Sequence, residues 1–173
     1  RKGNVKQYDI KETIINSKAR MTYTEVSDIL ENDDEELKAK YSHVVEEFKT
    51  AEVLAKILME RRNRRGAIDF DFPEAKIILT PEGKVSDIKE YERRISNRMI
   101  EEFMLVTNET VAEHFFWLQT PFVYRIHEIP AAEKMENLSK FIATFGYHIK
   151  GDLEDVHPKE IQSLVEKIKG TKE

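Results

Sequence analysis

The chain has 173 residues, a formal net charge of −5, and a composition of 40% hydrophobic and 35% charged residues, which excludes collagen-like and intrinsically disordered proteins. No apolar run reaches the ~20 residues that a membrane span needs, and the absence of cysteine excludes disulfides and thiolate chemistry. The acidic charge argues against a protein coated in positive charge that binds duplex nucleic acid, although it is compatible with a narrow basic channel. Without a signal-peptide pattern, we expect a soluble protein of the cytoplasm.

The N-terminal part predicts extended structure. Residues 5–24 alternate in side-chain character and are rich in β-branched and aromatic residues, which is typical of strands. From Tyr23 to Leu30 the pattern shortens and predicts a turn or a short helix. Because the chain opens with Arg1 and the first strand has no hairpin partner, we expect a piece of a longer protein.

A long helix is predicted next. Asn32, Asp33 or Asp34 can cap its first turn, and the acids that follow suit the positive end of the helix dipole. An apolar stripe at helical spacing extends this helix to about Arg62. The acidic run could also be a metal cluster, but consecutive acids in one helical turn point in different directions, so capping is the preferred interpretation.

Four arginines close this predicted helix: Arg61, Arg62, Arg64 and Arg65. Gly66 follows them as the expected left-handed stop. Cations at a helix C-terminus are stabilising without any ligand. Four of them exceed what one helix dipole requires, so contact with phosphate by at least one, such as Arg64 or Arg65, is an equal alternative.

A strand is predicted over 67–72, with Ile68, Phe70 and Phe72 on one face. Such rings either pack in a core or offer a flat surface on which bases stack. Two further strand patterns, "KIILT" and "KVSDIKEY", are joined by "PEG", a tight-turn signature. They predict a hairpin that continues the same sheet.

The second long helix is predicted from about Glu92 to Leu118. Apolar residues cover nearly every direction around its axis, which is typical of a buried central helix. Glu101 and Glu102 lie within that apolar run. A buried carboxylate needs a partner, so Glu102 is expected either to pair with an arginine or to bind hydroxyl groups of a ligand.

The C-terminal part predicts a loop, "QTPFVYRIHEIP", and two more helices, one ended by Gly146 and one with Pro158 in its first turn. The five histidines show no metal-ligand spacing, and there is no glycine-rich phosphate loop or serine elbow. The predicted fold class is α+β, with two long helices packed on a mostly antiparallel sheet and additional C-terminal helices, as part of a domain. The arginines and aromatic residues suit single-stranded nucleic acid.

Four stretches in this order resemble one family: "INSKARMTYTEVSDIL", "RRNRRGAIDFDFPEAKIIL", "RRISNRMIEEFMLVTNETVAEH" and "PFVYRIHEIP". Together they are similar to the second part of the catalytic domain in the ribonuclease R group of the ribonuclease II family, and the resemblance covers residues 1–173. It implies a 3′-to-5′ exoribonuclease that degrades single-stranded RNA from its 3′ end to nucleoside monophosphates, with no preference for DNA. Two Mg²⁺ ions at an aspartate cluster would perform the hydrolysis.

The resemblance also implies roles for single residues. Phe70 matches the family's clamp phenylalanine, which packs against the stacked terminal bases. Tyr23 and Glu102 match residues near the terminal ribose, where the 2′-hydroxyl separates RNA from DNA. Arg20 and Arg125 match family motifs whose contacts the resemblance does not assign, and a structural role for them is an equal alternative.

The family's aspartate cluster is absent from this sequence, as are the later arginine segment and the flanking cold-shock and S1 domains. We therefore expect a single incomplete domain, 1–173, that supplies base-stacking and ribose contacts but no catalytic or metal-binding residue and is inactive alone. The alternative is a non-catalytic scaffold of the same fold that binds RNA or a protein.

Overall fold

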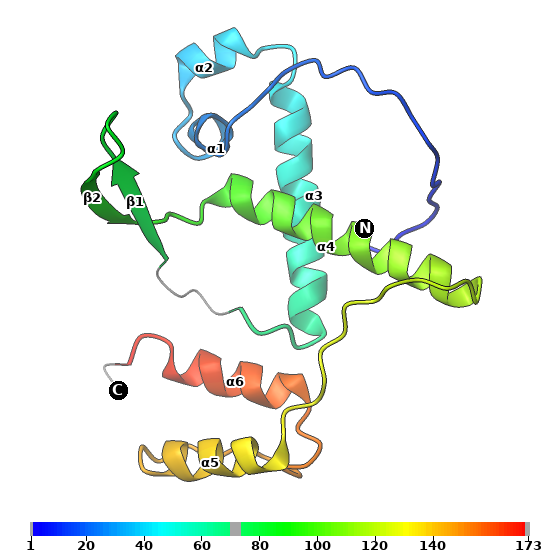
Figure 1. Ribbon diagram of the computed structural model, residues 1–173, viewed down its shortest axis with the longest axis vertical. Coiled ribbons are helices and arrows are strands. Elements are labelled where there is room, and N and C mark those ends of the chain that lie inside the picture. The colour runs from blue at the N-terminus through cyan, green and yellow to red at the C-terminus, as the bar shows by residue number, and fades with distance from the viewer. Residues whose placement is uncertain (1, 70–73, 172–173) are drawn as a thin grey trace. The chain divides into compact units, whose positions relative to one another are not determined.

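The computed structural model describes residues 2–69 and 74–171, which contain six helices and a two-stranded sheet (Figure 1). The predicted α+β class is confirmed. The chain divides into two compact units, one formed by Arg1–Met59 and Asp71–Val111 and the other by Glu60–Phe70 and Ala112–Glu173. Both long helices, α3 (Val45–Arg64) and α4 (Ile95–Trp117), pass from the first unit into the second.

The first helix, α1 (Tyr23–Glu31), begins at a capping box. The Thr22 hydroxyl accepts the Glu25 N–H at 3.2 Å, and the Glu25 carboxylate accepts the Thr22 N–H at 3.1 Å. Residues 2–22 form neither helix nor strand, so the predicted strand over 5–24 is wrong (Figure 1). An extended segment becomes a strand only when a neighbour accepts its ladder hydrogen bonds, and no described strand pairs with it.

The long helix expected up to Arg62 is divided in two. Asp34 caps α2 (Glu35–Lys40) by accepting the Leu37 N–H at 2.9 Å, and Asp33 before it has a positive φ of 58°. Tyr41 then leaves the helical conformation at φ −111°, ψ 27°, and α3 begins at Val45. The expectation of one continuous helix is therefore wrong, although the capping position is among the three predicted.

The predicted hairpin is confirmed. Strands β1 (Ala75–Leu79) and β2 (Val85–Glu90) pair antiparallel, with Lys76 opposite Lys89 and Ile77 opposite Ile88. Among the described residues this hairpin is the whole sheet.

The strand expected over 67–72 does not form within 67–69. The N–H of Ala67 donates to the Arg62 carbonyl at 3.2 Å, so the residues after α3 complete its C-terminal cap instead of a sheet ladder. Phe70 and Phe72 lie outside the described residues.

Helix α4 buries Ser96, Met99 and Glu102, three residues apart on one stripe. Ile100 and Met104 on other sides are exposed, so the expectation of burial all around the axis is wrong for this chain. The other buried apolar residues described in the first unit come from α1 and α3: Val26, Ile29, Val45, Ala55 and Leu58.

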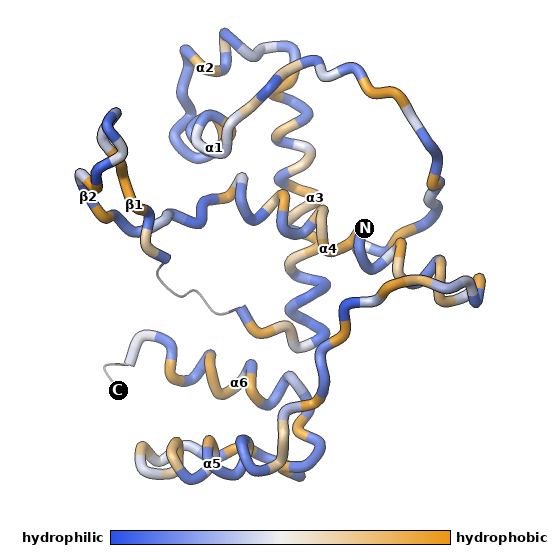
Figure 2. The backbone as a smooth tube through the Cα atoms, in the orientation of Figure 1, coloured by the Kyte–Doolittle hydropathy of each residue, from blue (hydrophilic) through white to orange (hydrophobic). Residues whose placement is uncertain are grey.

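The second unit contains α5 (Ala132–Ala143) and α6 (Pro158–Ile168), both at predicted places. Figure 2 shows hydrophobic and hydrophilic residues alternating along both helices, and Met135, Ile142 and Leu164 are their buried residues. The side-chain amide of Gln162 donates to the carbonyls of Asn63 (3.1 Å) and Ala67 (2.9 Å), which fixes α6 against the end of α3. None of the described helices has the length and apolar character that a bilayer crossing requires.

Candidate functional site

Tyr23 is held in place by its backbone. The buried Ser96 hydroxyl at the start of α4 donates to the Tyr23 carbonyl at 2.8 Å and lies 2.7 Å from the Ser27 hydroxyl. Arg94 adds ion pairs to Asp28 at 2.8 Å and to Glu31 at 2.7 Å. The start of α1 is thereby attached to the start of α4, while the Tyr23 side chain stays 49% exposed.

The Tyr23 side chain lines a cavity of about 350 Å³ within the first unit. The hairpin contributes Lys76, Ile78, Lys89 and Glu90 to the same cavity. The segment leading into α4 contributes Tyr91, Glu92 and Arg94, and the first turn of α4 contributes Asn97. Two aromatic rings and several charged groups therefore surround one hollow. This mixture can bind a flat ring and a charged group together.

Tyr91 has a fixed orientation at this cavity. The side-chain amide nitrogen of Asn97 donates to the Tyr91 hydroxyl at 2.8 Å. The side-chain carbonyl oxygen of Asn97 accepts the backbone N–H of Arg94 at 3.2 Å. Tyr91 remains partly exposed, at 41%. The ring is held by a hydrogen bond at one end, and its apolar body remains open to contact.

The two glutamates of α4 have different surroundings. Glu101 forms a bidentate ion pair with Arg93, whose Nε donates at 2.9 Å and 3.2 Å. Glu102 is only 3% exposed, as the sequence predicts. No buried side-chain nitrogen or oxygen among the described residues lacks a hydrogen-bond partner, so this carboxylate is satisfied within the chain.

The remaining predicted site residues do not gather at this cavity. Arg20 is exposed in the segment before α1. Arg64 pairs with Glu60 at 2.7 Å one helical turn away, Arg65 and Arg125 are exposed, and all three belong to the second unit. The stacking role predicted for Phe70 falls outside the described residues. Of the predicted residues that the structure describes, only Tyr23 lines the cavity.

Glu25 is the most strongly perturbed acid at this end of α1. The Tyr41 hydroxyl donates to its carboxylate at 2.8 Å, and the Thr22 hydroxyl donates at 2.9 Å. These hydrogen bonds, with that from Tyr41 the largest cause, lower the pKa of Glu25 from 4.5 to about 2. The carboxylate is therefore ionised under ordinary conditions, and it links α1 to the residue that ends α2.

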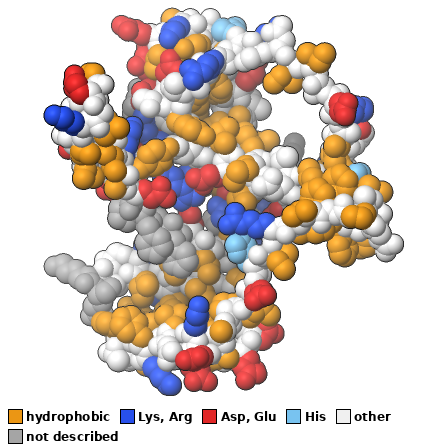
Figure 3. All heavy atoms as spheres, in the orientation of Figure 1, with side chains coloured by type: hydrophobic (Ala, Val, Ile, Leu, Met, Phe, Trp, Pro, Cys, Tyr) orange, Lys and Arg blue, Asp and Glu red, His pale blue; other side chains and the backbone are white. Residues whose placement is uncertain are grey.

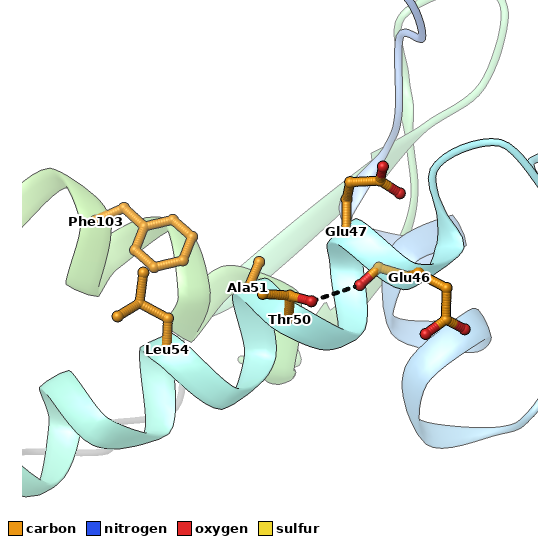
Figure 4. A pocket seen from close by; sticks show the side chains of 6 residues that line it. All are labelled: Glu46, Glu47, Thr50, Ala51, Leu54 and Phe103. Carbon is orange, nitrogen blue, oxygen red and sulfur yellow. Dashed lines mark hydrogen bonds between the residues drawn. The ribbon is translucent and has the colours of Figure 1, made fainter. Parts of the chain in front are cut away.

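A second cavity, of about 440 Å³, lies between α3 and α4 in the first unit (Figure 4). Leu54 and Phe103 face each other at one end, and the carboxylates of Glu46 and Glu47 lie at the other. Two carboxylates repel phosphate, so this cavity does not suit a nucleic acid. Within the described part of the chain, no group of three histidines or acids could hold a metal ion.

Comparison with known proteins decides the family. The model of the RNB domain family matches residues 1–173. The chain belongs to the RNB domain family. Ribonuclease R 1 of Lactococcus lactis is 43% identical to this RNB chain over 168 residues, which is 97% of the chain and 20% of that protein. Ribonuclease R of Aquifex aeolicus is 42% identical over 171 residues, 99% of the chain and 24% of that protein.

The RNB chain is also similar to a solved structure, the RNase R of Mycoplasma genitalium in complex with ribose-methylated single-stranded RNA. The TM-score is 0.77 at 25% identity, and the match covers 87% of this chain and 23% of the other. The chain therefore spans about a fifth to a quarter of the length of the relatives it matches.

Sequence reasoning missed the other nine described residues that line the Tyr23 cavity, among them Lys76, Lys89, Tyr91 and Asn97. The hairpin itself is predictable, and strand alternation places Lys89 and Tyr91 on one face. The register that brings Lys76 opposite Lys89 depends on where the turn closes, and "PEG" alone does not fix it. The sequence therefore indicates which residues share a face of the strand, but not which residues lie opposite each other across the hairpin.

Proposed function

We propose that residues 1–173 form the second part of an RNB catalytic domain, and that the protein containing them degrades single-stranded RNA from the 3′ end to nucleoside monophosphates. The match of the RNB model to the whole chain carries this proposal. Further support comes from ribonuclease R relatives at 41–43% identity and from a structural neighbour solved with single-stranded RNA. A cytoplasmic location belongs to the same proposal.

In this proposal the chain supplies contacts to RNA. Phe70 stacks on the terminal bases, and Tyr23 and Glu102 contact the terminal ribose, which favours RNA over DNA. Glu102 is buried, and its carboxylate already has a hydrogen-bond partner within the chain. In this proposal the carboxylate therefore contacts the ribose in addition to that partner. The cations proposed to contact the phosphates are Arg20, Arg64, Arg65 and Arg125.

Two Mg²⁺ ions belong to the proposed reaction and would activate water and stabilise the leaving oxygen. The described residues do not fit such a site, because no cluster of acids or histidines among them could hold a metal. The ions are therefore assigned to aspartates of the full-length protein outside this chain. The chain alone is expected to hydrolyse no RNA with or without Mg²⁺.

A chimera tests the proposal. The matching fifth of Lactococcus lactis ribonuclease R 1 would be replaced by residues 1–173, and a 5′-labelled single-stranded RNA followed over time on a sequencing gel. We expect progressive shortening from the 3′ end. In the same chimera, Phe70→Ala should weaken RNA binding by about 1–3 kcal/mol, the contribution of stacking on one base.

A folded chimera that binds RNA without shortening it would instead favour a non-catalytic scaffold. Unchanged affinity and product length after Phe70→Ala would assign Phe70 to the core. Circular dichroism of each variant separates these results from misfolding.

A further inference from the structure

The hairpin carries two lysines in an unfavourable pairing. Lys76 in β1 lies directly opposite Lys89 in β2 in the antiparallel register. Directly opposed residues have Cβ atoms about 4.5–5.5 Å apart, and like charges at such positions destabilise a hairpin. Lys89 has a distant counterion, Asp87 at 3.7 Å, whereas no ion pair of Lys76 occurs among the described residues. The repulsion is therefore only partly compensated by the residues that the structure describes.

Both lysines line the Tyr23 cavity, together with two tyrosines. The cavity also contains Arg94, whose charge is already matched by Asp28 and Glu31 on α1. Glu90 and Glu92 contribute negative charge, but alternation along β2 places the Glu90 side chain on the opposite face of the strand from Lys89. The hairpin face that carries Lys76 and Lys89 also carries Asp87, and with two lysines to one acid it is the basic face of the hairpin.

We propose that Lys76 and Lys89 form a phosphate-binding pair for single-stranded RNA, and that a base next to the bound phosphate stacks on Tyr91. This site rests on the proposed function and adds to it a contact with the RNA backbone. A phosphate between two ammonium groups relieves their repulsion and gains two charge-assisted hydrogen bonds. The Tyr91 ring, fixed by Asn97 at 2.8 Å and partly exposed, provides the adjacent stacking surface.

The chemistry of this site predicts how it discriminates between nucleic acids. Phosphates of RNA and DNA are alike, so the lysine pair positions the strand without selecting its sugar. Any preference for RNA must come from other residues. The lysine pair is therefore expected to contribute equally to binding of RNA and of DNA with the same sequence.

The test measures binding of the 173-residue chain to a fluorescein-labelled U₁₂ RNA by anisotropy at several salt concentrations. Neutralising one phosphate-binding lysine should reduce the slope of log K against log[salt] by about 0.7, so Lys76→Gln with Lys89→Gln should reduce it by about 1.4. Lys76→Arg with Lys89→Arg keeps both charges and should restore the slope. Lys84→Gln, in the same hairpin but outside the cavity, should leave the slope unchanged.

Two further arms test the rest of the site. Tyr91→Leu should weaken binding about tenfold at fixed salt while keeping the slope. With 5-iodouridine in the RNA, photo-crosslinking followed by mass spectrometry should place the crosslink on Tyr91.

The proposal is overturned if the Gln pair keeps the wild-type slope, if Lys84→Gln reduces it as much, or if the wild-type chain does not bind U₁₂ at low salt. Crosslinks confined to other segments would also overturn it. These results are separate from the gel assay of the chimera. A chimera can fail to shorten RNA while the lysine pair still binds phosphate, and it can shorten RNA with both lysines replaced.

Discussion

At the scale of single residues, Glu25 connects two elements of the first unit through its charge. Its carboxylate accepts hydrogen bonds from Tyr41, at the end of α2, and from Thr22, the cap of α1. The Lys40 ammonium nitrogen lies 3.4 Å from the same carboxylate. These contacts favour the ionised carboxylate and lower its pKa to about 2. Their contribution to stability therefore exists only while Glu25 carries its charge.

The pH dependence of this contribution has a definite sign. The folded-state pKa of Glu25 lies below its ordinary value of 4.5, so the stabilisation is complete above about pH 4.5 and is lost as the pH falls toward 2. We expect Glu25→Gln to lower the urea midpoint at pH 6. The difference from wild type should shrink through this window and vanish near pH 2, as measured by urea unfolding at half-unit steps.

Tyr41→Phe provides the matched variant, because it keeps the carboxylate and removes only the first donor. It should show a smaller pH-dependent loss over the same window. A difference between wild type and Glu25→Gln that stays constant from pH 6 to pH 2 would contradict the assignment, since it would reflect packing and not charge.

At the scale of elements, α3 and α5 end in the same hydrogen-bonded arrangement. Gly66 has φ +95° after α3, and Gly146 has φ +81° after α5. In each case the glycine N–H bonds to the carbonyl three residues earlier, and the next N–H bonds to the carbonyl five residues earlier, a Schellman motif. The surroundings differ, because a Cβ on Gly66 would lie 2.9 Å from the backbone nitrogen of Lys159, while nothing lies within 4 Å of one on Gly146.

These two positions separate backbone strain from steric overlap. Gly146→Ala should cost about 1–2 kcal/mol, because only the left-handed conformation opposes it. Gly66→Ala should cost more than Gly146→Ala, because the new methyl also displaces the first turn of α6. Urea unfolding of both variants at pH 7 gives the comparison. Equal losses would mean that the contact between Gly66 and Lys159 does not constrain the fold.

Local chemistry explains which elements the sequence predicts. The glycine stops, the capping acids, Pro158 at the start of α6 and the "PEG" turn are all decided within a few residues. The two main errors depend on distant contacts. Residues 5–22 have strand-like composition but no described strand to pair with, and Tyr41 leaves its helix while bonded to Glu25, sixteen residues earlier.

The same distinction between local and distant contacts separates the residues of the candidate site that the sequence predicts from those that it does not. The burial of Glu102 follows from helical spacing to Met99, and both are buried. The resemblance to a family supplies Tyr23, which composition and periodicity do not single out. The pairing of Lys76 with Lys89 could not be predicted, because it depends on the hairpin register and on the approach of α1 and α4 to one face of the hairpin.

At the scale of the whole molecule, the hairpin presents an apolar face opposite its basic face. Ile77, Leu79, Val85 and Ile88 are all between 56% and 64% exposed, and the register pairs them with one another. Figure 3 shows hydrophobic side chains gathered over this hairpin. A two-stranded hairpin is marginally stable alone, and a contiguous apolar face of this kind usually contacts another surface.

The relatives are four to five times as long as this chain, so in the full-length protein we expect other segments to cover this face. In a solution of the isolated chain, a second copy can cover this face. We therefore predict reversible self-association of the 173-residue chain at concentrations of tens of micromolar, measured by sedimentation velocity. Ile77→Lys with Ile88→Lys should shift the chain toward monomer, because it places charges at the centre of the apolar face.

Lys84→Glu is the control, because it changes the charge at the hairpin turn without altering the apolar face. It should associate like wild type. The same two isoleucine substitutions should have a different effect in the chimera with Lactococcus lactis ribonuclease R 1, where the face is expected to be covered. There a buried lysine pair would lower the thermal stability and leave the oligomeric state unchanged. A wild-type chain that remains monomeric throughout, or a chimera whose stability is unaffected, would show that this face is not an interface.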